Sequence, residues 1–205
     1  SGTWDNLGIL FFKMNKQIAI IAFLFLCAQA FAHKPVLNDN SAYPPDAPYE
    51  VEEPEISKAI YSTLNGAPHY YRIRSDIDFD FYAGILAAKI GECALEQKFS
   101  FEVLDSEFHR IDLADGDNFE WTPWYEEYGK QWYWNGPEIG KNFLSDRVYK
   151  AGTYYIKVFN NTNTGQYIMA IGDIEKFSFT DIVGLLFSMG DIEDEFWSPS
   201  LCDLS

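Results

Sequence analysis

The chain has 205 residues, with 31 acidic against 15 basic side chains and a formal net charge of −16. A surface of this sign repels phosphate groups, so we expect neither nucleic-acid binding nor adhesion to anionic lipid. Because 47% of the residues are hydrophobic and 18% aromatic, the chain can build a sizeable core and is not a disordered acidic segment.

The first 32 residues carry the pattern of a secretory signal peptide. Met14-Asn-Lys-Gln precedes the apolar run Ile18–Cys27, and two Ala-x-Ala steps follow it at 28–30 and 30–32. A membrane-spanning helix needs about 20 apolar residues, so this run is too short to span a bilayer. We interpret residues 1–13 as an upstream non-native or fragment segment and residues 14–32 as the signal peptide. Cleavage before His33 is expected, with cleavage after Ala30 as the alternative.

Removal of these 32 residues leaves about 173 residues with 13 basic and 30 acidic side chains. This length fits one domain of ordinary size. We therefore expect an exported protein, periplasmic or extracellular, without a transmembrane span in its mature chain.

Residues 33–55 form a proline-rich segment with five prolines among Asn, Asp, Glu and Tyr residues. Proline lacks the backbone N–H that helices and central strands require. The sequence therefore predicts an extended arm here that lies along the domain surface.

Residues 56–172 show many short runs of strand character, separated by turn signals such as Asn65-Gly66 and Asp115-Gly116. Alternation with a period of two, clearest from Ile77 to Ala83, indicates strands with one solvated face. The pattern predicts an all-β fold, an antiparallel β-sandwich or jelly roll. The expected strands are Ile60–Leu64, His69–Arg74, Ile77–Ala83, Ile85–Ile90, Phe99–Leu104, Phe108–Leu113, Asp146–Lys150, Thr153–Asn160 and Gly165–Gly172.

Residues 173–205 are predicted to form a short C-terminal helix and a tail. Apolar residues at 179, 182, 183, 186 and 189 follow a helical spacing, with Ser178 or Thr180 as candidate cap. We expect this helix to pack on the sandwich, because about 12 residues cannot cross a membrane.

Two segments resemble a known bacterial domain. Ala151–Asn160 and Thr164–Gly172 are similar to the closing hairpin of the pre-peptidase C-terminal type β-sandwich, with its "G-x-Y-x-[IV]-x-V" and "G-x-Y" strands. The strand from His69 to Ile73 resembles that family's "D-x-Y-x-[FI]" strand, with His69 in place of aspartate. The arm and residues 172–177 are more similar to a group of exported bacterial β-sandwich proteins. The resemblance implies a small, non-catalytic, extracytoplasmic sandwich and transfers no catalytic residue.

The three histidines suggest one possible metal site. An N-terminal His33 would offer its α-amine and imidazole, and His69 or His109 could add a second imidazole. Copper(II) favours nitrogen ligands in a tetragonal plane, and this set supplies three. The alternative is that one histidine falls at the cleavage point by chance.

A tight acidic turn suggests a second possible metal site. Calcium binds six to eight oxygen ligands, which often come from such a loop. The spacing is not that of an EF-hand, so a solvated turn is the favoured interpretation and calcium the alternative. The candidate ligands are Asp112, Asp115, Asp117 and Asn118.

Residues 119–137 form an aromatic run that we interpret as a long loop. Flat rings can stack on sugar faces or contact a protein partner, and they can equally pin a loop to a sheet by burying their area. The candidate ligand-binding residues are Trp121, Trp124, Tyr125, Tyr128, Trp132, Tyr133 and Trp134.

Cys93 and Cys202 remain after removal of the signal peptide and can pair in an oxidising compartment. Such a bond would stabilise the fold by about 4–5 kcal/mol through loop closure if it were unstrained. The sequence leaves both formation and non-formation of this bond open.

The sequence contains no nucleophile elbow, zinc-protease helix or phosphate-binding loop. We therefore predict a non-catalytic binding module for a glycan or protein partner. The alternative is a periplasmic copper protein, either a carrier or an oxidative enzyme, that uses the N-terminal histidine brace.

Overall fold

The computed structural model describes residues 34–37, 41–127, 130–175, 190 and 192–198. The predicted signal peptide, His33, Tyr128, Cys202 and the predicted helix at 178–189 lie outside the described residues. All described residues belong to one compact unit that comprises residues 32–205.

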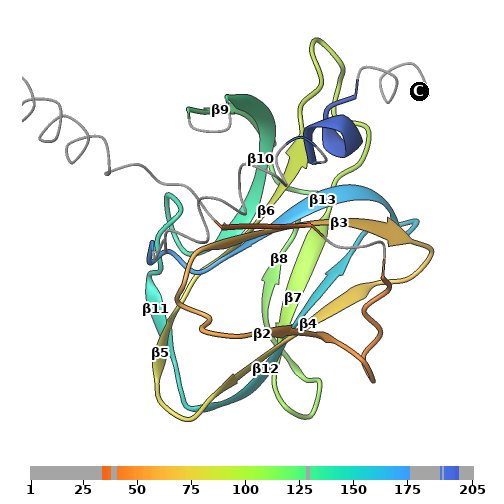
Figure 1. Ribbon diagram of the computed structural model, residues 1–205. Helices are drawn as coiled ribbons and strands as arrows, with labels where there is room; N and C mark the ends of the chain where they lie inside the picture. Colours follow the sequence, from red (N-terminus) through yellow and green to blue (C-terminus); the bar gives the residue numbers. More distant parts are fainter. Residues whose placement is uncertain (1–33, 38–40, 128–129, 176–189, 191, 199–205) are drawn as a thin grey trace, which may run out of the picture. The chain divides into compact units, whose positions relative to one another are not determined.

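A six-stranded sheet forms one layer of this unit (Figure 1). Its neighbouring strands are antiparallel, except for the parallel pair β1–β3. In spatial order the strands are β1 (Lys34–Leu37), β3 (Lys58–Asn65), β13 (Thr164–Ile171), β6 (Ala83–Ala88), β10 (Gln131–Ile139) and β9 (Thr122–Glu126).

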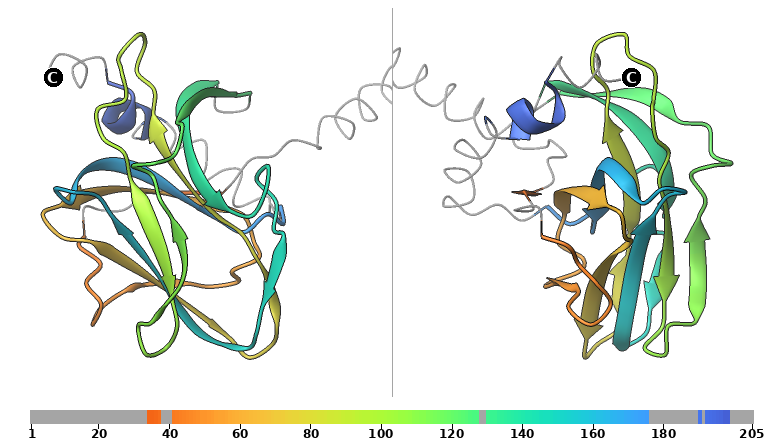
Figure 2. Two further views of the ribbon diagram at one scale, coloured as in Figure 1. Left: turned by 180° about the vertical axis from the view of Figure 1, so that it is seen from behind. Right: turned by 90° about the vertical axis from the view of Figure 1, so that its right-hand side faces the viewer.

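A five-stranded sheet forms the second layer, which Figure 2 shows packed face to face with the first. The large core between the sheets contains Tyr71, Ile73, Phe101, Ile156 and Met169, all fully buried. The β-sandwich predicted from the sequence is therefore confirmed. In spatial order the strands are β2 (Tyr49–Val51), β4 (His69–Ser75), β12 (Gly152–Phe159), β7 (Ser100–Leu104) and β8 (Arg110–Ala114).

A small two-stranded sheet closes one side, where β5 (Phe79–Phe81) pairs with β11 (Arg147–Tyr149). The sequence pattern had predicted one strand from Ile77 to Ala83, but the chain leaves β5 and enters β6 at Ala83. Phe81 and Tyr149 stack with ring centroids 4.3 Å apart, so this small sheet is held by aromatic packing.

The proline-rich segment contributes a strand to each layer. Strand β1 adds parallel to β3 and β2 adds parallel to β4, and both lie at sheet edges. An edge strand tolerates Pro35 because one side of it needs no hydrogen-bond donors. The sequence pattern showed the extended conformation of this segment but not its pairing with both sheets.

Residues 119–137, for which the aromatic run predicted a long loop, contain most of a β-hairpin. Strands β9 and β10 pair antiparallel from Thr122↔Asn135 to Glu126↔Gln131. The loop interpretation was wrong because consecutive aromatic residues hide the alternation of a strand whose two faces both carry large side chains.

Part of the outer face of the six-stranded sheet is covered by the helical residues 192–196. Ile192 and Phe196 are buried there against Tyr61 and Ile168. Among the described residues, no helix has the length and apolarity that crossing a membrane requires.

Candidate functional site: the aromatic hairpin

The β9–β10 hairpin sorts its aromatic residues onto two faces. Trp132 pairs with Tyr125, and the next residue, Tyr133, pairs with Trp124. Because neighbouring side chains on a strand point to opposite faces, these two pairs lie on opposite sides of the hairpin. The hairpin lies at the β9 edge of the six-stranded sheet (Figure 1).

The face that carries Trp124 and Tyr133 is a packing face. Trp124 contacts Tyr133 and Phe143, and Tyr133 also meets the ring of Trp197 edge-on at 5.1 Å. The hydroxyls of Tyr61 and Tyr133 lie 3.0 Å apart. Burial raises the pKa of Tyr61 to about 12 and also raises the pKa of Tyr133, so both phenols stay neutral at physiological pH.

The base of the hairpin is anchored by Trp121, which is buried. Its indole nitrogen donates a hydrogen bond of 2.9 Å to the carbonyl of Gly116. The indole lies against Gly136, where an added Cβ would come within 2.4 Å of the ring. Glycine at this position therefore lets Trp121 lock the hairpin to the core.

The face that carries Trp132 is partly open to solvent: Trp132 is exposed, while Trp134 on the same face is half-buried against the large core. Trp132 is 48% exposed, and its ring centroid lies 5.2 Å from that of Tyr125. The ammonium of Lys89 lies 6.0 Å from the centroid of Trp132 and 5.6 Å from that of Trp134, at cation–π distance. We call Tyr125, Trp132, Trp134 and Lys89 the aromatic platform.

The backbone of the platform is held from two sides. The carbonyl of Trp132 accepts a hydrogen bond of 3.0 Å from the Lys89 amide and one of 2.9 Å from the Trp197 indole. The exposed ring therefore projects from a fixed strand, not from a long loop. A period of two, applied to residues 131–135, would have placed Trp132 and Tyr133 on opposite faces.

The two described histidines occupy different environments. His69 is buried, and its Nδ1 lies 2.8 Å from the Tyr167 hydroxyl and 3.2 Å from that of Ser62. Burial lowers the pKa of His69 to about 4, which keeps its imidazole neutral. His109 lies in the exposed β7–β8 turn, 3.3 Å from Asp105. Because His33 lies outside the described residues, the copper site stays a prediction.

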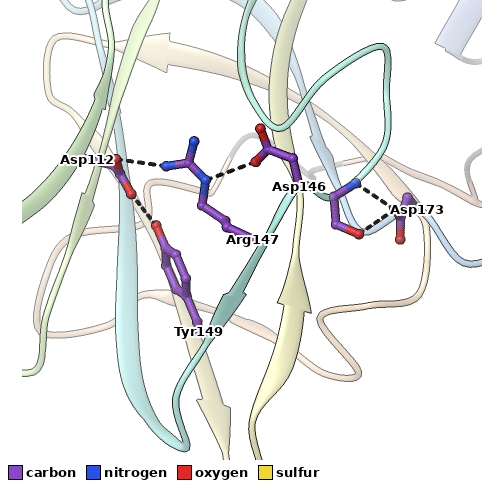
Figure 3. A network of polar contacts seen from close by, with 6 residues as sticks. Asp112, Asp146, Arg147, Tyr149 and Asp173 are labelled. Carbon is purple, nitrogen blue, oxygen red and sulfur yellow. Dashed lines mark hydrogen bonds and ion pairs between the residues drawn. The ribbon is translucent and has the colours of Figure 1, made fainter.

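One of the four candidate calcium ligands, Asp112, is bound to residues outside the acidic turn. The Asp112 carboxylate accepts a hydrogen bond of 3.0 Å from Arg147 and one of 2.6 Å from the Tyr149 hydroxyl; Figure 3 shows both contacts. In the same view, Arg147 also donates a hydrogen bond to Asp146. Nearby along the chain, the backbone N–H and the hydroxyl of Ser145 both donate to Asp173.

The other three candidate ligands form local turn contacts. Asp115 binds the Asn118 side chain at 2.7 Å and the Asp117 amide at 3.1 Å, while the Asp117 carboxylate meets Asn161 at 3.5 Å. Within the described part of the chain, no three His, Cys, Asp or Glu side chains are grouped to hold a metal ion.

Cys93 is disulfide-bonded and lies in the loop between β6 and β7. Its pairing with Cys202 stays a prediction, because Cys202 lies outside the described residues.

No protein-family model matches the sequence, and no curated protein matches it significantly. Among solved structures, the chain is similar to the pre-peptidase C-terminal domain of a collagenase from Bacillus anthracis. The identity is 11% and the TM-score 0.35, over 66% of this chain and 98% of that domain.

Two carbohydrate-active enzymes also match parts of the chain. The catalytic domain of a GH87 α-1,3-glucanase in complex with nigerose is 10% identical, with a TM-score of 0.30 over 58% of this chain. A β-glucosidase from Paenibacillus barengoltzii is 8% identical, with a TM-score of 0.26 over 67% of this chain. The chain spans only 22% and 13% of these two structures. At TM-scores below 0.5, none of these similarities carries an argument about function.

Proposed function

We propose that this protein is an exported, non-catalytic binding module whose aromatic platform contacts a neutral carbohydrate. The observation that carries the proposal is the half-exposed ring of Trp132, held on a fixed strand beside Tyr125 and Lys89. Indole and phenol rings bury large areas against flat apolar surfaces, and the C–H faces of a pyranose offer such a surface.

Pre-organisation supports this role for the platform. A ring on a fixed strand loses little conformational freedom on binding, so more of its contact energy appears as affinity. The two hydrogen bonds to the Trp132 carbonyl and the anchoring of Trp121 provide that rigidity. The platform therefore needs little rearrangement to receive a ligand.

Charge supports a neutral ligand over an anionic one. The chain carries a net charge of −16, which raises the free energy of any approaching polyanion. Lys89 is the cation of the platform and can donate hydrogen bonds to sugar hydroxyls. Neutral glucans and related polymers fit these properties better than uronic-acid polymers do.

Affinity electrophoresis in gels that contain neutral polysaccharides tests the proposal. The change Trp132→Ala should weaken retardation at least tenfold, because it removes the exposed stacking surface. Phe108→Ala is the matched control, since Phe108 is 44% exposed in the β7–β8 turn, away from the platform, and stacks on Tyr155. We expect this control to bind within about twofold of the wild type, as surface changes away from a site have small effects. Equal retardation of both variants would exclude the platform as the binding site. Binding of a protein partner without binding of any glycan would exclude a carbohydrate as the ligand.

A further inference from the structure

A cavity of about 360 Å³ lies beside the loop of residues 89–99, which connects β6 and β7. This loop and the helical residues 192–196 lie at the same end of the sandwich in both Figures 1 and 2. The cavity is lined by β3, β6, β13, the loop and Phe196, and we call it the end pocket. Its volume falls within the range of about 300–1,000 Å³ that small-molecule sites occupy.

Small residues leave the end pocket open. Ala87, Ala88, Ala94 and Gly165 line it where larger side chains would fill the space. Gly165 has a φ of +103°, and an added Cβ would lie only 1.9 Å from the Gln97 side-chain oxygen. The pocket is open to solvent on one side, so a small molecule can enter it from the surface.

Polar groups at the pocket are held in place by the protein itself. The Gln97 amide donates to the Thr164 hydroxyl at 3.3 Å and accepts from Asn160 at 3.4 Å. The side-chain nitrogen Nε2 of Gln166 donates a hydrogen bond of 3.0 Å to the backbone carbonyl of Glu195. The two carboxamides are therefore oriented before any ligand arrives.

The loop over the pocket is tethered along its length. At its start, the backbone N–H of Lys89 donates a hydrogen bond to the carbonyl of Trp132. At its centre, Cys93 forms a disulfide bond. Near its end, Lys98 donates to the carbonyls of Asp117 and Phe119 at 3.2 and 3.3 Å. These contacts keep the pocket formed without a ligand, as in most small-molecule sites.

We propose that the end pocket binds a small uncharged molecule with an apolar body and one hydroxyl or amide group. Leu95, Phe99 and Phe196 supply the apolar lining, while Thr63, Gln97 and Gln166 supply hydrogen-bonding groups. Glu96 is the one charged side chain among the described lining residues, and it is exposed. Its charge disfavours an anion, and an exposed ion pair adds too little to select a cation.

The first test is a titration of the ¹⁵N-labelled protein with benzyl alcohol, followed by NMR. We expect saturable shifts at millimolar concentration, confined to the amides of residues 63, 87–99 and 165–166. Benzoate, which has the same ring but a negative charge, should bind at least fivefold more weakly. Shifts that are unsaturable or scattered over the surface would overturn the site, and equal binding of benzoate would overturn the preference for an uncharged ligand.

Variants separate the end pocket from the aromatic platform. Ala94→Trp should reduce benzyl alcohol binding at least fivefold by filling the space, while Ala151→Trp, an exposed alanine elsewhere, should not. Gln166→Leu removes the amide at similar volume and should weaken binding severalfold, with thermal melting confirming that each variant is folded. Trp132→Ala should leave this binding unchanged, and loss of binding in that variant would instead place the probe on the platform. If the protein binds benzyl alcohol but no polysaccharide, the proposed function is wrong and the proposal for the end pocket still holds.

Discussion

Two aromatic clusters of this protein differ in their exposure to solvent: one is buried with its polar groups paired inside the protein, and the other lies partly at the surface. In the sealed cluster, Tyr71 and Tyr167 place their hydroxyls 2.6 Å apart, and Tyr167 also lies 2.8 Å from His69. All three side chains are buried. In the aromatic platform, Trp132 stays 48% exposed. Similar residue types therefore serve as internal structure in one place and as accessible surface in the other.

The N-terminal segment accounts for the seal. Between β1 and β2, the backbone carbonyl of Tyr43 accepts a hydrogen bond of 2.7 Å from the backbone N–H of Tyr70. Its ring packs 5.2 Å from that of His69 and 5.6 Å from that of Tyr71. The proline-rich segment thus covers a polar network that would otherwise face water at the side of the sandwich. The platform has no comparable cover over Trp132 among the described residues.

The largest difference between the two clusters should appear on truncation. Tyr71→Ala should lower the free energy of unfolding by about 3–5 kcal/mol, because it opens a cavity and leaves the Tyr167 hydroxyl without one partner. Urea denaturation at pH 7 measures the change. A loss below about 1 kcal/mol would show that the sealed cluster does not hold the sheets together.

Acidification to pH 4 should lower the free energy of unfolding of the wild type by about 3 kcal/mol through His69. The pKa of His69 is lowered to about 4 in the folded protein, against about 6.5 in the unfolded chain. Between pH 6.5 and pH 4 the unfolded chain binds a proton at His69 while the folded protein does not. The folded state is therefore fully stable with respect to His69 above pH 6.5 and loses stability as the pH falls from 6.5 to 4. Urea denaturation of the wild type and His69→Gln at pH 7 and pH 4 should show a smaller loss in the variant. Parallel pH profiles would contradict the assignment.

The smallest effect on stability should come from the platform. Trp132→Ala should change the free energy of unfolding by less than about 1 kcal/mol, since the ring is half exposed and the hydrogen bonds use its backbone carbonyl. The same urea series measures it. A loss comparable to that of Tyr71→Ala would mean that Trp132 is a packing residue and would remove the basis of the proposed function.

Much of the sandwich could be predicted from local pattern. His69, Tyr71 and Ile73 alternate with half-buried or exposed residues along β4, and this period of two is visible in the sequence. The turn at Asn65-Gly66 likewise indicates the end of β3. Strands β9 and β10 escaped prediction because Trp132, Tyr133 and Trp134 are consecutive aromatic residues that show no alternation.

The candidate site was only partly accessible from the sequence. Composition identified the aromatic run, but it could not separate Trp121, Trp124 and Tyr133, which pack, from Trp132, which is exposed. That division depends on the strand register and on the helical residues that cover one face. The end pocket gave no sequence signal, because it arises where four distant segments meet.

By itself, the sequence determined the fold class, the strong negative charge and the positions of most strands, because these follow from composition and local periodicity. Only the tertiary structure decided that the proline-rich segment pairs with both sheets, that His69 is sealed beneath Tyr43 and that Trp132 remains exposed. These outcomes depend on which distant surfaces meet, and side-chain burial between such surfaces is not encoded in any local pattern.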